Sequence, residues 1–246
     1  MGKGCVEGPT TAVVLAGGRG SRLASVVPDR PKVLAQVGGQ PFLGHVLARL
    51  LAAGVEEVVL CTGHLAPQIE AAFGTEFGGL RLVYSTETGP LGTAGALRLA
   101  APLLAADPVL VLNGDSLCGV DLRAFWSWHH ASGARVSLVT VQVADGRAGG
   151  RVEADGAGRV VRFVEKSPQR GPARVNAGIY AVPLELLHEL PAGRPLSLER
   201  DLLPAWVGCG LHAYASNGTL LDIGTPASYA AAIALAGQGG LRACAS

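Results

Sequence analysis

A glycine-rich segment near the start of the chain carries the clearest signs of chemistry. It reads Leu15-Ala16-Gly17-Gly18-Arg19-Gly20-Ser21-Arg22-Leu23, with Pro31-Lys32 shortly after it. Glycines that directly follow a buried strand let the backbone approach a ligand, and their amides can point at phosphate oxygens. The arginines and the lysine could neutralise a triphosphate. From the glycines alone, an ordinary strand-to-helix turn with solvated arginines is an equally good interpretation.

Two familiar phosphate-binding patterns do not fit this segment. Leu23 stands where the dinucleotide-binding fingerprint needs its third glycine, and no acidic residue ends the second expected strand. The pattern G-x-x-x-x-G-K-[ST] of P-loop nucleotidases does not occur in the chain. A phosphate-binding loop here would therefore be of another kind.

Two aspartates are candidate ligands for a hard cation. Asp115 follows an apolar run and would lie at the sheet edge where open α/β sheets bind ligands. Mg²⁺ needs one or two carboxylates besides phosphate oxygens and water, so Asp115 and Asp222 would suffice. Taken singly, Asp115 also fits a turn residue and Asp222 a helix cap. No Ser-His-Asp or Cys-His arrangement is recognisable, so no side-chain nucleophile is expected.

The segments between these motifs alternate between strand and helix patterns. Strands are expected at 11–15, 55–61, 80–85, 109–113 and 135–143, and helices at 42–53, 65–73, 93–101 and 122–131. This rhythm is typical of an α/β fold with a mainly parallel sheet and helices on both faces. After Gly149 we expect a hairpin (151–153 with 160–165), strands at 177–182 and 220–223, and helices at 184–190, at 198–207 and from Thr225-Pro226 onward.

Composition limits the classes of partner. The chain has 246 residues and a net charge of +1, from 20 basic and 19 acidic residues, which argues against nucleic acid and against a polybasic membrane patch. No apolar run approaches the roughly 20 residues of a membrane-spanning helix. The 5 cysteines form no CxxC pair, and the CxxH spacings at Cys61 and Cys209 have no second half, so no zinc site is expected. Reduced thiols in a cytoplasmic protein are the expectation.

The glycine-rich segment resembles the signature of the sugar-nucleotide pyrophosphorylases, L-A-G-G-x-G-T-R-L followed by P-K, with serine at Ser21 in place of threonine. Five further segments match the family in its order: PLGTAGA at 90–96, NGD at 113–115, FVEK at 163–166, NAGIY at 176–180 and DIGTP at 222–226. Each match alone is weak, but together they are specific. Members of this family use Mg²⁺ to join a nucleoside triphosphate to a sugar 1-phosphate and release pyrophosphate.

The resemblance implies a role for each matching residue. Arg22 and Lys32 would be catalytic, and Asp115 and Asp222 would hold Mg²⁺. The sugar phosphate would be bound by Gly150, Glu165, Lys166 and Asn176, although Gly149 replaces an aromatic residue of the family, which puts part of that pocket in doubt. The nucleotide would be bound by Leu15, Ala16, Gly17, Gly18, Arg19, Gly20, Ser21, Glu87, Gly92, Thr93, Asn113 and Gly114.

The implied fold is a Rossmann-like (GT-A-like) sheet with a small sugar-binding lobe. We expect one domain over 11–237, with a nucleotide half at about 11–145 and a sugar-phosphate half at about 146–237. Residues 1–10 would form a disordered leader and residues 238–246 a frayed tail. The sequence does not predict the oligomeric state, so a homo-oligomer stays open, as do the pathway and any allosteric control.

Glu87 bears on the choice of base. A carboxylate offers only acceptors, which suits the adjacent N–H and NH₂ donors of guanine, whereas relatives that use thymine or uracil often carry glutamine here. GTP is therefore favoured. The segment at 87–95 resembles mannose-1-phosphate guanylyltransferases. A resemblance to the short D-glycero-α-D-manno-heptose 1-phosphate guanylyltransferases comes from three segments together, at 176–180, 197–204 and 222–226. Heptose 1-phosphate is therefore the preferred acceptor.

Three alternatives remain. One is a mannose-1-phosphate guanylyltransferase, and another is an enzyme that transfers from UTP or dTTP to a hexose 1-phosphate. The third is a catalytically silent regulatory subunit, which we would expect to have lost a metal carboxylate or a phosphate cation. Arg22, Lys32, Asp115 and Asp222 are all present and argue against that interpretation.

Overall fold

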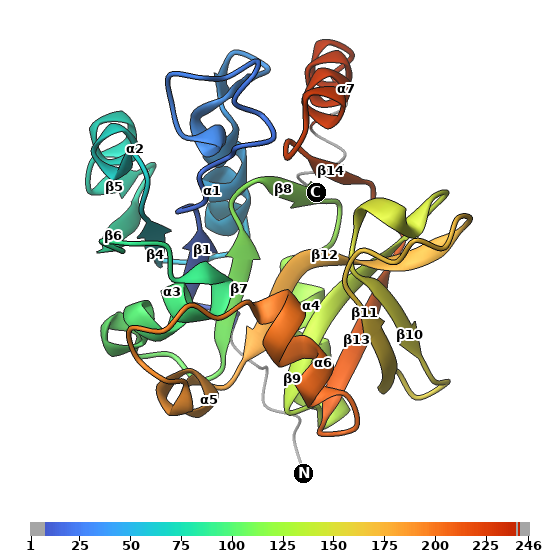
Figure 1. Ribbon diagram of the computed structural model, residues 1–246. Coiled ribbons are helices and arrows are strands. Elements are labelled where there is room, and N and C mark those ends of the chain that lie inside the picture. Colours follow the sequence, from blue (N-terminus) through green and yellow to red (C-terminus); the bar gives the residue numbers. More distant parts are fainter. Residues whose placement is uncertain (1–7, 240, 242–246) are drawn as a thin grey trace.

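A ten-stranded mixed sheet forms the centre of the protein in a computed structural model that describes residues 8–239 and 241 (Figure 1). Its main path runs in the order β11-β10-β12-β7-β1-β4-β6-β5, and β9 and β13 join it through β12. Its parallel part consists of β1 (Thr11–Leu15), β4 (Glu57–Thr62), β6 (Leu80–Thr86) and β7 (Val109–Asn113). The expected α/β fold with a mainly parallel, Rossmann-like sheet is confirmed.

Helices cover both faces of this sheet because its strands are apolar on both sides. In β1, Ala12 and Val14 pack into one hydrophobic cluster and Val13 into a second, and none of the three is exposed. The first cluster contains buried residues of α1 (Phe42–Ala52), α2 (Ala66–Phe73), α4 (Leu122–Ser132) and α7 (Pro226–Gly237). The second contains those of α3 (Gly92–Ala100), α5 (Leu184–Glu189), the π-helical turn η4 (Leu198–Leu202) and α6 (Leu203–Trp206).

The second half of the chain departs from the expected elements in three ways. Strand β12 (Ala173–Val182) begins four residues earlier than 177 and runs antiparallel to β7 and to β9 (Val136–Val143). Strand β13 (Leu211–Ser216), which was not predicted, pairs parallel with β9. The helix expected at 198–207 is instead η4 followed by the single turn of α6, where Pro204 has no backbone N–H to donate.

Short strand pairs complete the architecture. The predicted hairpin forms from β10 (Arg151–Ala154) and β11 (Val160–Val164). Strand β8 (Ser116–Cys118) pairs antiparallel with β14 (Leu220–Asp222), which leads into α7. The remaining short elements are β2 (Gln36–Val37), β3 (Gln40–Pro41), β5 (Glu76–Phe77) and the 3-10 turns η1 (Lys32–Leu34), η2 (Ala101–Leu103) and η3 (Gly146–Ala148).

Most of the predicted leader (1–10) and tail (238–246) lies outside the described residues, which exclude 1–7, 240 and 242–246. The division of 11–237 into two halves stays a prediction. Among residues 8–239 and 241, no helix is long and apolar enough to cross a membrane.

Candidate active site

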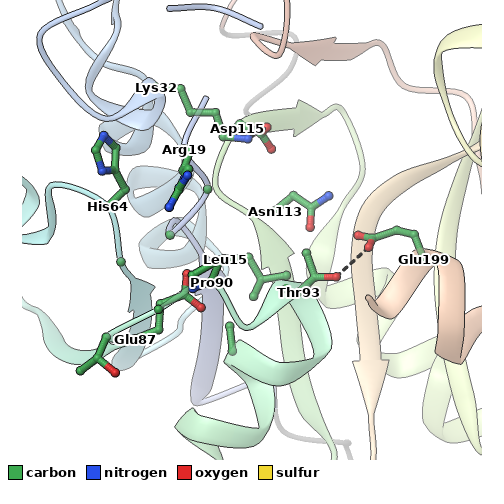
Figure 2. Close-up of a pocket in the computed structure, with 17 residues that line it drawn as sticks. Leu15, Arg19, Lys32, His64, Glu87, Pro90, Thr93, Asn113, Asp115 and Glu199 are labelled. Atoms are coloured by element: carbon green, nitrogen blue, oxygen red, sulfur yellow. Dashed lines mark hydrogen bonds and ion pairs between the residues drawn. The ribbon is translucent and has the colours of Figure 1, made fainter. Parts of the chain in front are cut away.

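A cavity of about 500 Å³ opens at the carboxyl ends of the parallel strands (Figure 2). This is the edge at which open α/β sheets bind ligands. Most of its lining comes from the residues that follow β1, β4, β6 and β7 and from the start of α3. Among the residues expected to bind substrates, the following line it: Leu15, Gly17, Gly18, Arg19, Lys32, Glu87, Gly92, Thr93, Asn113 and Asp115.

The glycine-rich loop begins where β1 ends and packs closely against Lys32. The amide of Ala16 donates to the carbonyl of Cys61 at 2.8 Å, which continues the pairing of β1 with β4 by one residue. Gly20 has a φ of +61°, and a Cβ built there would lie 3.1 Å from the Cβ of Lys32. Glycine at this position therefore permits both the left-handed turn and the approach of the lysine to the loop.

Lys32 and Asp115 meet at one end of the cavity. The ammonium of Lys32 donates to Oδ2 of Asp115, and each side chain is about 20% exposed. Lys32 is brought there by η1 and Asp115 by the end of β7, so residues far apart in the sequence converge (Figure 2). The pair supplies one positive and one negative group at the place where the phosphates were expected.

The pairing of β8 with β14 brings Asp222 next to Asp115. Asp222 lies opposite Ser116 in the antiparallel register, and the amide of Ile223 donates to the carbonyl of Asp115 at 3.0 Å. Oδ1 of Asp222 accepts hydrogen bonds from the amide of Gly224 and the hydroxyl of Ser228, both at 2.9 Å. The N-cap of α7 is Thr225, so the capping role considered for Asp222 is not found. No hydrogen bond within the described chain reaches the Oδ2 of Asp222.

These two carboxylates fit a cation that is shared with a substrate. Mg²⁺ usually takes one or two protein carboxylates and completes its shell with phosphate oxygens and water. Within residues 8–239 and 241, no group of three or more histidine, cysteine, aspartate or glutamate residues could form an all-protein metal site. Two carboxylates of this kind suit a divalent cation whose other ligands come from outside the protein.

Asn113 offers an unpaired acceptor inside the cavity. Its Oδ1 atom is buried and receives no hydrogen bond from the described residues. Gly178, with a φ of +74°, faces the other side of the amide, and a Cβ there would lie 2.7 Å from Nδ2. A buried acceptor without a partner loses free energy unless water or a small shift of its surroundings supplies a donor.

Glu87 forms part of the wall of the cavity. Its Oε2 accepts the amide of Leu91 at 2.9 Å, and its own amide donates to the carbonyl of Thr62. A Cβ on Gly63 would lie 2.7 Å from its Oε1, so the carboxylate rests on bare backbone. Burial raises the pKa of Glu87, although the hydrogen bond from Leu91 acts in the other direction. The side chain is thus a partly desolvated carboxylate at the cavity wall.

The residues expected to bind the sugar phosphate form a cluster that does not line this cavity. A Cβ on Gly150 would lie 2.8 Å from Oε2 of Glu165, and the carbonyl of Gly150 accepts the amide of Asn176 at 2.8 Å. Nδ2 of Asn176 donates to the hydroxyl of Tyr180 at 2.7 Å. Burial raises the pKa of Glu165, and the nearby Glu199 raises it further. Lys166 has a φ of +55°, which is rare for a residue with a side chain.

Arg22 lies between the two groups of residues. A Cβ on Gly224 would be 3.4 Å from Nη2 of Arg22 and 3.2 Å from Oδ1 of Asp222. The guanidinium is also close enough to Glu165 to lower the pKa of that carboxyl. Arg22 does not line the cavity itself, and neither do Ala16, Gly20, Ser21 or Gly114.

Seven residues that line the cavity were not among the predicted site residues, namely Gly63, His64, Thr88, Gly89, Pro90, Ala96 and Glu199. His64 follows β4, and Glu199 is the second residue of η4. The sequence around Glu199 was noted only for its resemblance to heptose enzymes. Its place in the site depends on η4 folding back onto α3, a contact between segments about a hundred residues apart, which local patterns do not reveal.

Comparison with known proteins identifies the family. The model of the Nucleotidyl transferase family matches residues 11–238. The chain belongs to this family. Mannose-1-phosphate guanylyltransferase of Mycobacterium tuberculosis is 39% identical over 222 residues, which cover 89% of this chain and 62% of that protein. D-glycero-alpha-D-manno-heptose 1-phosphate guanylyltransferase of Aneurinibacillus thermoaerophilus is 32% identical over 219 residues, covering 89% and 94%.

Solved structures agree with this membership. HddC from Yersinia pseudotuberculosis superposes on this nucleotidyl transferase with a TM-score of 0.82 at 29% identity, covering 92% of this chain and 98% of that one. The same protein complexed with GMP-PN gives a TM-score of 0.80. This chain spans about three fifths of the length of the mannose-1-phosphate guanylyltransferases it matches.

Proposed function

We propose that this nucleotidyl transferase moves a guanylyl group from GTP to a manno-configured sugar 1-phosphate and releases pyrophosphate. The main support is the convergence of the glycine-rich loop, the Lys32–Asp115 pair and Glu87 around one cavity, with the Glu165 and Asn176 cluster beside it. One substrate would occupy the cavity and the other the cluster. Names of relatives add support, because both enzymes compared above are guanylyltransferases.

The reaction needs charge and positioning rather than a protein nucleophile. A phosphate oxygen of the sugar 1-phosphate attacks the α-phosphorus of GTP, and the bond from that phosphorus to the bridging oxygen of pyrophosphate breaks. Arg19 and Lys32 lie at the cavity and would offset the charge that develops on the phosphates. Arg22, located toward Glu165, would act on the side of the entering sugar phosphate. Loop amides would hold the phosphates in line.

Mg²⁺ would be held by Asp115 and Asp222. When bound, it would neutralise phosphate charge and thereby make the α-phosphorus easier to attack. The ammonium of Lys32 is already paired with Asp115, so the lysine and the cation would share the negative charge of that carboxylate.

Guanine would be selected by Glu87. Its Oε2 is occupied by the amide of Leu91, so Oε1 is the oxygen left to accept a hydrogen bond from an N–H group of the base. Guanine presents two adjacent donors to this carboxylate, whereas uracil and thymine present one N–H group flanked by carbonyl oxygens that a carboxylate would repel.

The acceptor is proposed as a manno-configured sugar 1-phosphate, a class that contains mannose 1-phosphate and D-glycero-α-D-manno-heptose 1-phosphate. The heptose enzyme of A. thermoaerophilus is matched over 94% of its length, while the mannose enzyme of M. tuberculosis has the higher identity of 39%. The segments at 176–180, 197–204 and 222–226 favour heptose 1-phosphate as the first substrate to test, with mannose 1-phosphate as the second.

Release of pyrophosphate tests the proposal directly. The purified chain is mixed with Mg²⁺ and with each of GTP, ATP, UTP, CTP and dTTP, crossed with the 1-phosphates of heptose, mannose, glucose and N-acetylglucosamine. We expect a signal with GTP and one or both manno-configured sugars. A signal confined to UTP or dTTP would overturn the choice of base. Folded protein without a signal in any combination would overturn the transfer reaction and favour the silent regulatory subunit.

A further inference from the structure

Glu199 enters the cavity from the side opposite Glu87 (Figure 2). Its Oε2 accepts a hydrogen bond from the hydroxyl of Thr93 at 2.7 Å and another from the hydroxyl of Ser197 at 3.1 Å. Within residues 8–239 and 241, no donor reaches its Oε1. One carboxylate oxygen is therefore held by the protein, and the other remains able to accept a hydrogen bond.

The segment that carries Glu199 is held tightly against the start of α3. The amide of Ala94 donates to the carbonyl of Leu196 at 3.0 Å, and the amide of Leu196 donates to the carbonyl of Leu91 at 2.8 Å. A Cβ on Gly92 would lie only 2.4 Å from the carbonyl oxygen of Leu196. This close backbone contact sets the position of Glu199 relative to the cavity.

The hydroxyl of Thr93 is used within the protein. It donates its one hydrogen to Glu199 and accepts the amide of Leu198 at 2.7 Å. A hydroxyl has a single hydrogen, so Thr93 cannot at the same time donate to a bound nucleotide. Its side chain therefore orients Glu199.

Glu199 also acts on the residues expected to bind the sugar. After burial, it is the largest cause that raises the pKa of both Glu165 and Tyr180. Tyr180 accepts the hydrogen bond from Asn176. The carboxylate thus lines the cavity and is also near enough to the sugar-phosphate cluster to act on its charged groups. A second negative charge so close to Glu165 would repel a phosphate, so this place suits an uncharged hydroxyl.

We propose that Glu199 is a sugar-binding residue whose Oε1 accepts a hydrogen bond from a ring hydroxyl of the sugar 1-phosphate, and that Thr93 and Ser197 position it. This inference rests on the proposed transfer to a sugar 1-phosphate. A hydrogen bond from a hydroxyl to a carboxylate is stronger than one between neutral groups and is directional, so it would help to select the configuration of the sugar.

Replacement of the carboxylate tests the contact. Glu199→Ala is expected to raise KM for the sugar 1-phosphate on the order of 10- to 100-fold, the usual effect of losing a hydrogen bond to a charged group, while KM for GTP stays within about twofold. Glu199→Gln keeps an oxygen for Thr93 but removes the charge, so a smaller rise is expected. Glu189→Gln, the same change on an exposed residue at the end of α5, is the matched control.

Deoxy sugars separate a direct contact from a structural effect. The wild type and Glu199→Ala are compared on the 2-, 3-, 4- and 6-deoxy analogues of the best sugar 1-phosphate. If Glu199 receives a hydrogen bond from one hydroxyl, the penalty of the substitution disappears on the analogue that lacks this hydroxyl and persists on the others. A penalty of equal size on all analogues would overturn the inference, because a general distortion of the site would not depend on one hydroxyl.

The other possible results of the Glu199→Ala experiment distinguish a failure of this inference from a failure of the proposed function. If KM for GTP rises instead, Glu199 binds the nucleotide and the inference is wrong. If the wild type transfers to a sugar 1-phosphate and Glu199→Ala has an unchanged KM for it, the inference fails while the proposed function stands. If the wild type transfers to none of the sugars, the proposed function itself fails. Thermal melting of each variant checks that it is folded.

The positioning role of Thr93 has its own test. Thr93→Val keeps the shape of the side chain but can neither donate to Glu199 nor accept from Leu198. We expect KM for the sugar 1-phosphate to rise, and Thr93→Ser, which restores the hydroxyl, to recover most of the loss. In a Glu199→Ala background, Thr93→Val should add little to the sugar KM, because the residue that it positions is gone. Full additivity of the two effects would overturn the positioning role.

Discussion

Lys32 and Asp115, which are 83 residues apart in the sequence, form an ion pair at the end of the cavity. The lysine follows the glycine-rich loop, and the aspartate follows the neighbouring strand β7. The cation that we propose for the phosphates and the carboxylate that we propose for the metal thus neutralise each other within one site. Binding of Mg²⁺ and a triphosphate would divide this pair between two new partners, with the ammonium turning to phosphate oxygens and the carboxylate to the metal.

Removal of the Asp115 charge should abolish most metal-dependent turnover. In Asp115→Asn the side chain keeps its shape but binds Mg²⁺ poorly and no longer neutralises Lys32. We expect kcat/KM to fall by a factor on the order of 10² to 10³, with a melting temperature close to that of the wild type. The fall in kcat/KM is measured as pyrophosphate release over a range of Mg²⁺ concentrations. Glu56→Gln, a change at an exposed residue, is the control. Turnover equal to the wild type would exclude Asp115 as a metal ligand.

Loss of the Lys32 charge should depress turnover for a different reason. Lys32→Met keeps much of the packing against Gly18 and Gly20 but removes the cation expected at the phosphates. We expect kcat to fall by a factor on the order of 10². The Mg²⁺ concentration for half-maximal rate should not increase, because Asp115 loses its competing partner. Arg170→Gln removes an exposed cation and serves as the control. An unchanged kcat would mean that Lys32 serves only to neutralise Asp115.

Selection of guanine should depend on the charge of Glu87. Glu87→Gln is expected to lower the ratio of kcat/KM for GTP to that for UTP by a factor on the order of 10 to 100. Because burial raises the pKa of Glu87, its carboxylate takes up a proton at a higher pH than an exposed glutamate would. In the wild type, KM for GTP should therefore rise as pH falls through this raised pKa, and the variant should lack the effect. The same ratio in both proteins would place base recognition elsewhere.

Gly63 should matter because it supports Glu87. A Cβ at this position would lie 2.7 Å from Oε1 of Glu87, so Gly63→Ala should push the carboxylate away from its present place. We expect a loss of GTP selectivity in the same direction as for Glu87→Gln. Gly156→Ala, where an added Cβ meets nothing within 4 Å, is the matched control. The ratio of kcat/KM for GTP to that for UTP is measured for both variants. An equal ratio in the two would show that the carboxylate tolerates displacement.

His129 should make stability depend on pH. Burial, with smaller effects of His130 and His212, lowers its pKa to about 4, and its Nδ1 contacts the hydroxyl of Ser137 at 2.7 Å. The unfolded chain takes up this proton near the ordinary value of about 6.5, so between the two values it binds more protons than the folded protein. The free energy of unfolding should therefore fall as pH decreases from about 6.5 to 4, by up to about 3 kcal/mol.

Urea unfolding at several pH values measures this dependence. His129→Gln keeps a polar partner for Ser137 and does not titrate, so its decline over the same pH range should be shallower. Parallel curves for the two proteins would mean that other groups cause the acid sensitivity.

The parallel strands β1 and β7 were predictable from sequence because they are short apolar runs that are buried on both faces. The runs at 11–15 and 109–113 carry enough Val and Leu to be recognised without knowledge of their partners. Strand β13 was missed because its sequence, Leu-His-Ala-Tyr-Ala-Ser, has no β-branched residue and becomes a strand through pairing with β9. Tertiary contact decided its structure.

In the candidate site, too, some residues were predictable from local sequence and others were not. Motifs located Lys32, Asp115 and Glu87, since each stands next to a recognisable strand end or glycine segment. Nothing local marked Glu199, whose approach to Thr93 depends on the return of the chain over α3. Spacing alone also could not reveal that the sugar-phosphate cluster lies beside the cavity rather than in its lining.

The pairing of β8 with β14 has a consequence for how the protein is made. Synthesis proceeds from the N-terminus at roughly 5 to 20 residues per second, so the strand that follows Asp115 emerges from the ribosome well before its partner. Ile223, whose amide holds the carbonyl of Asp115, must leave the exit tunnel before the two carboxylates can stand together. About 200 residues separate the glycine-rich loop from Ile223, so a nascent chain would carry the loop for roughly 10 to 40 seconds before the two carboxylates could come together.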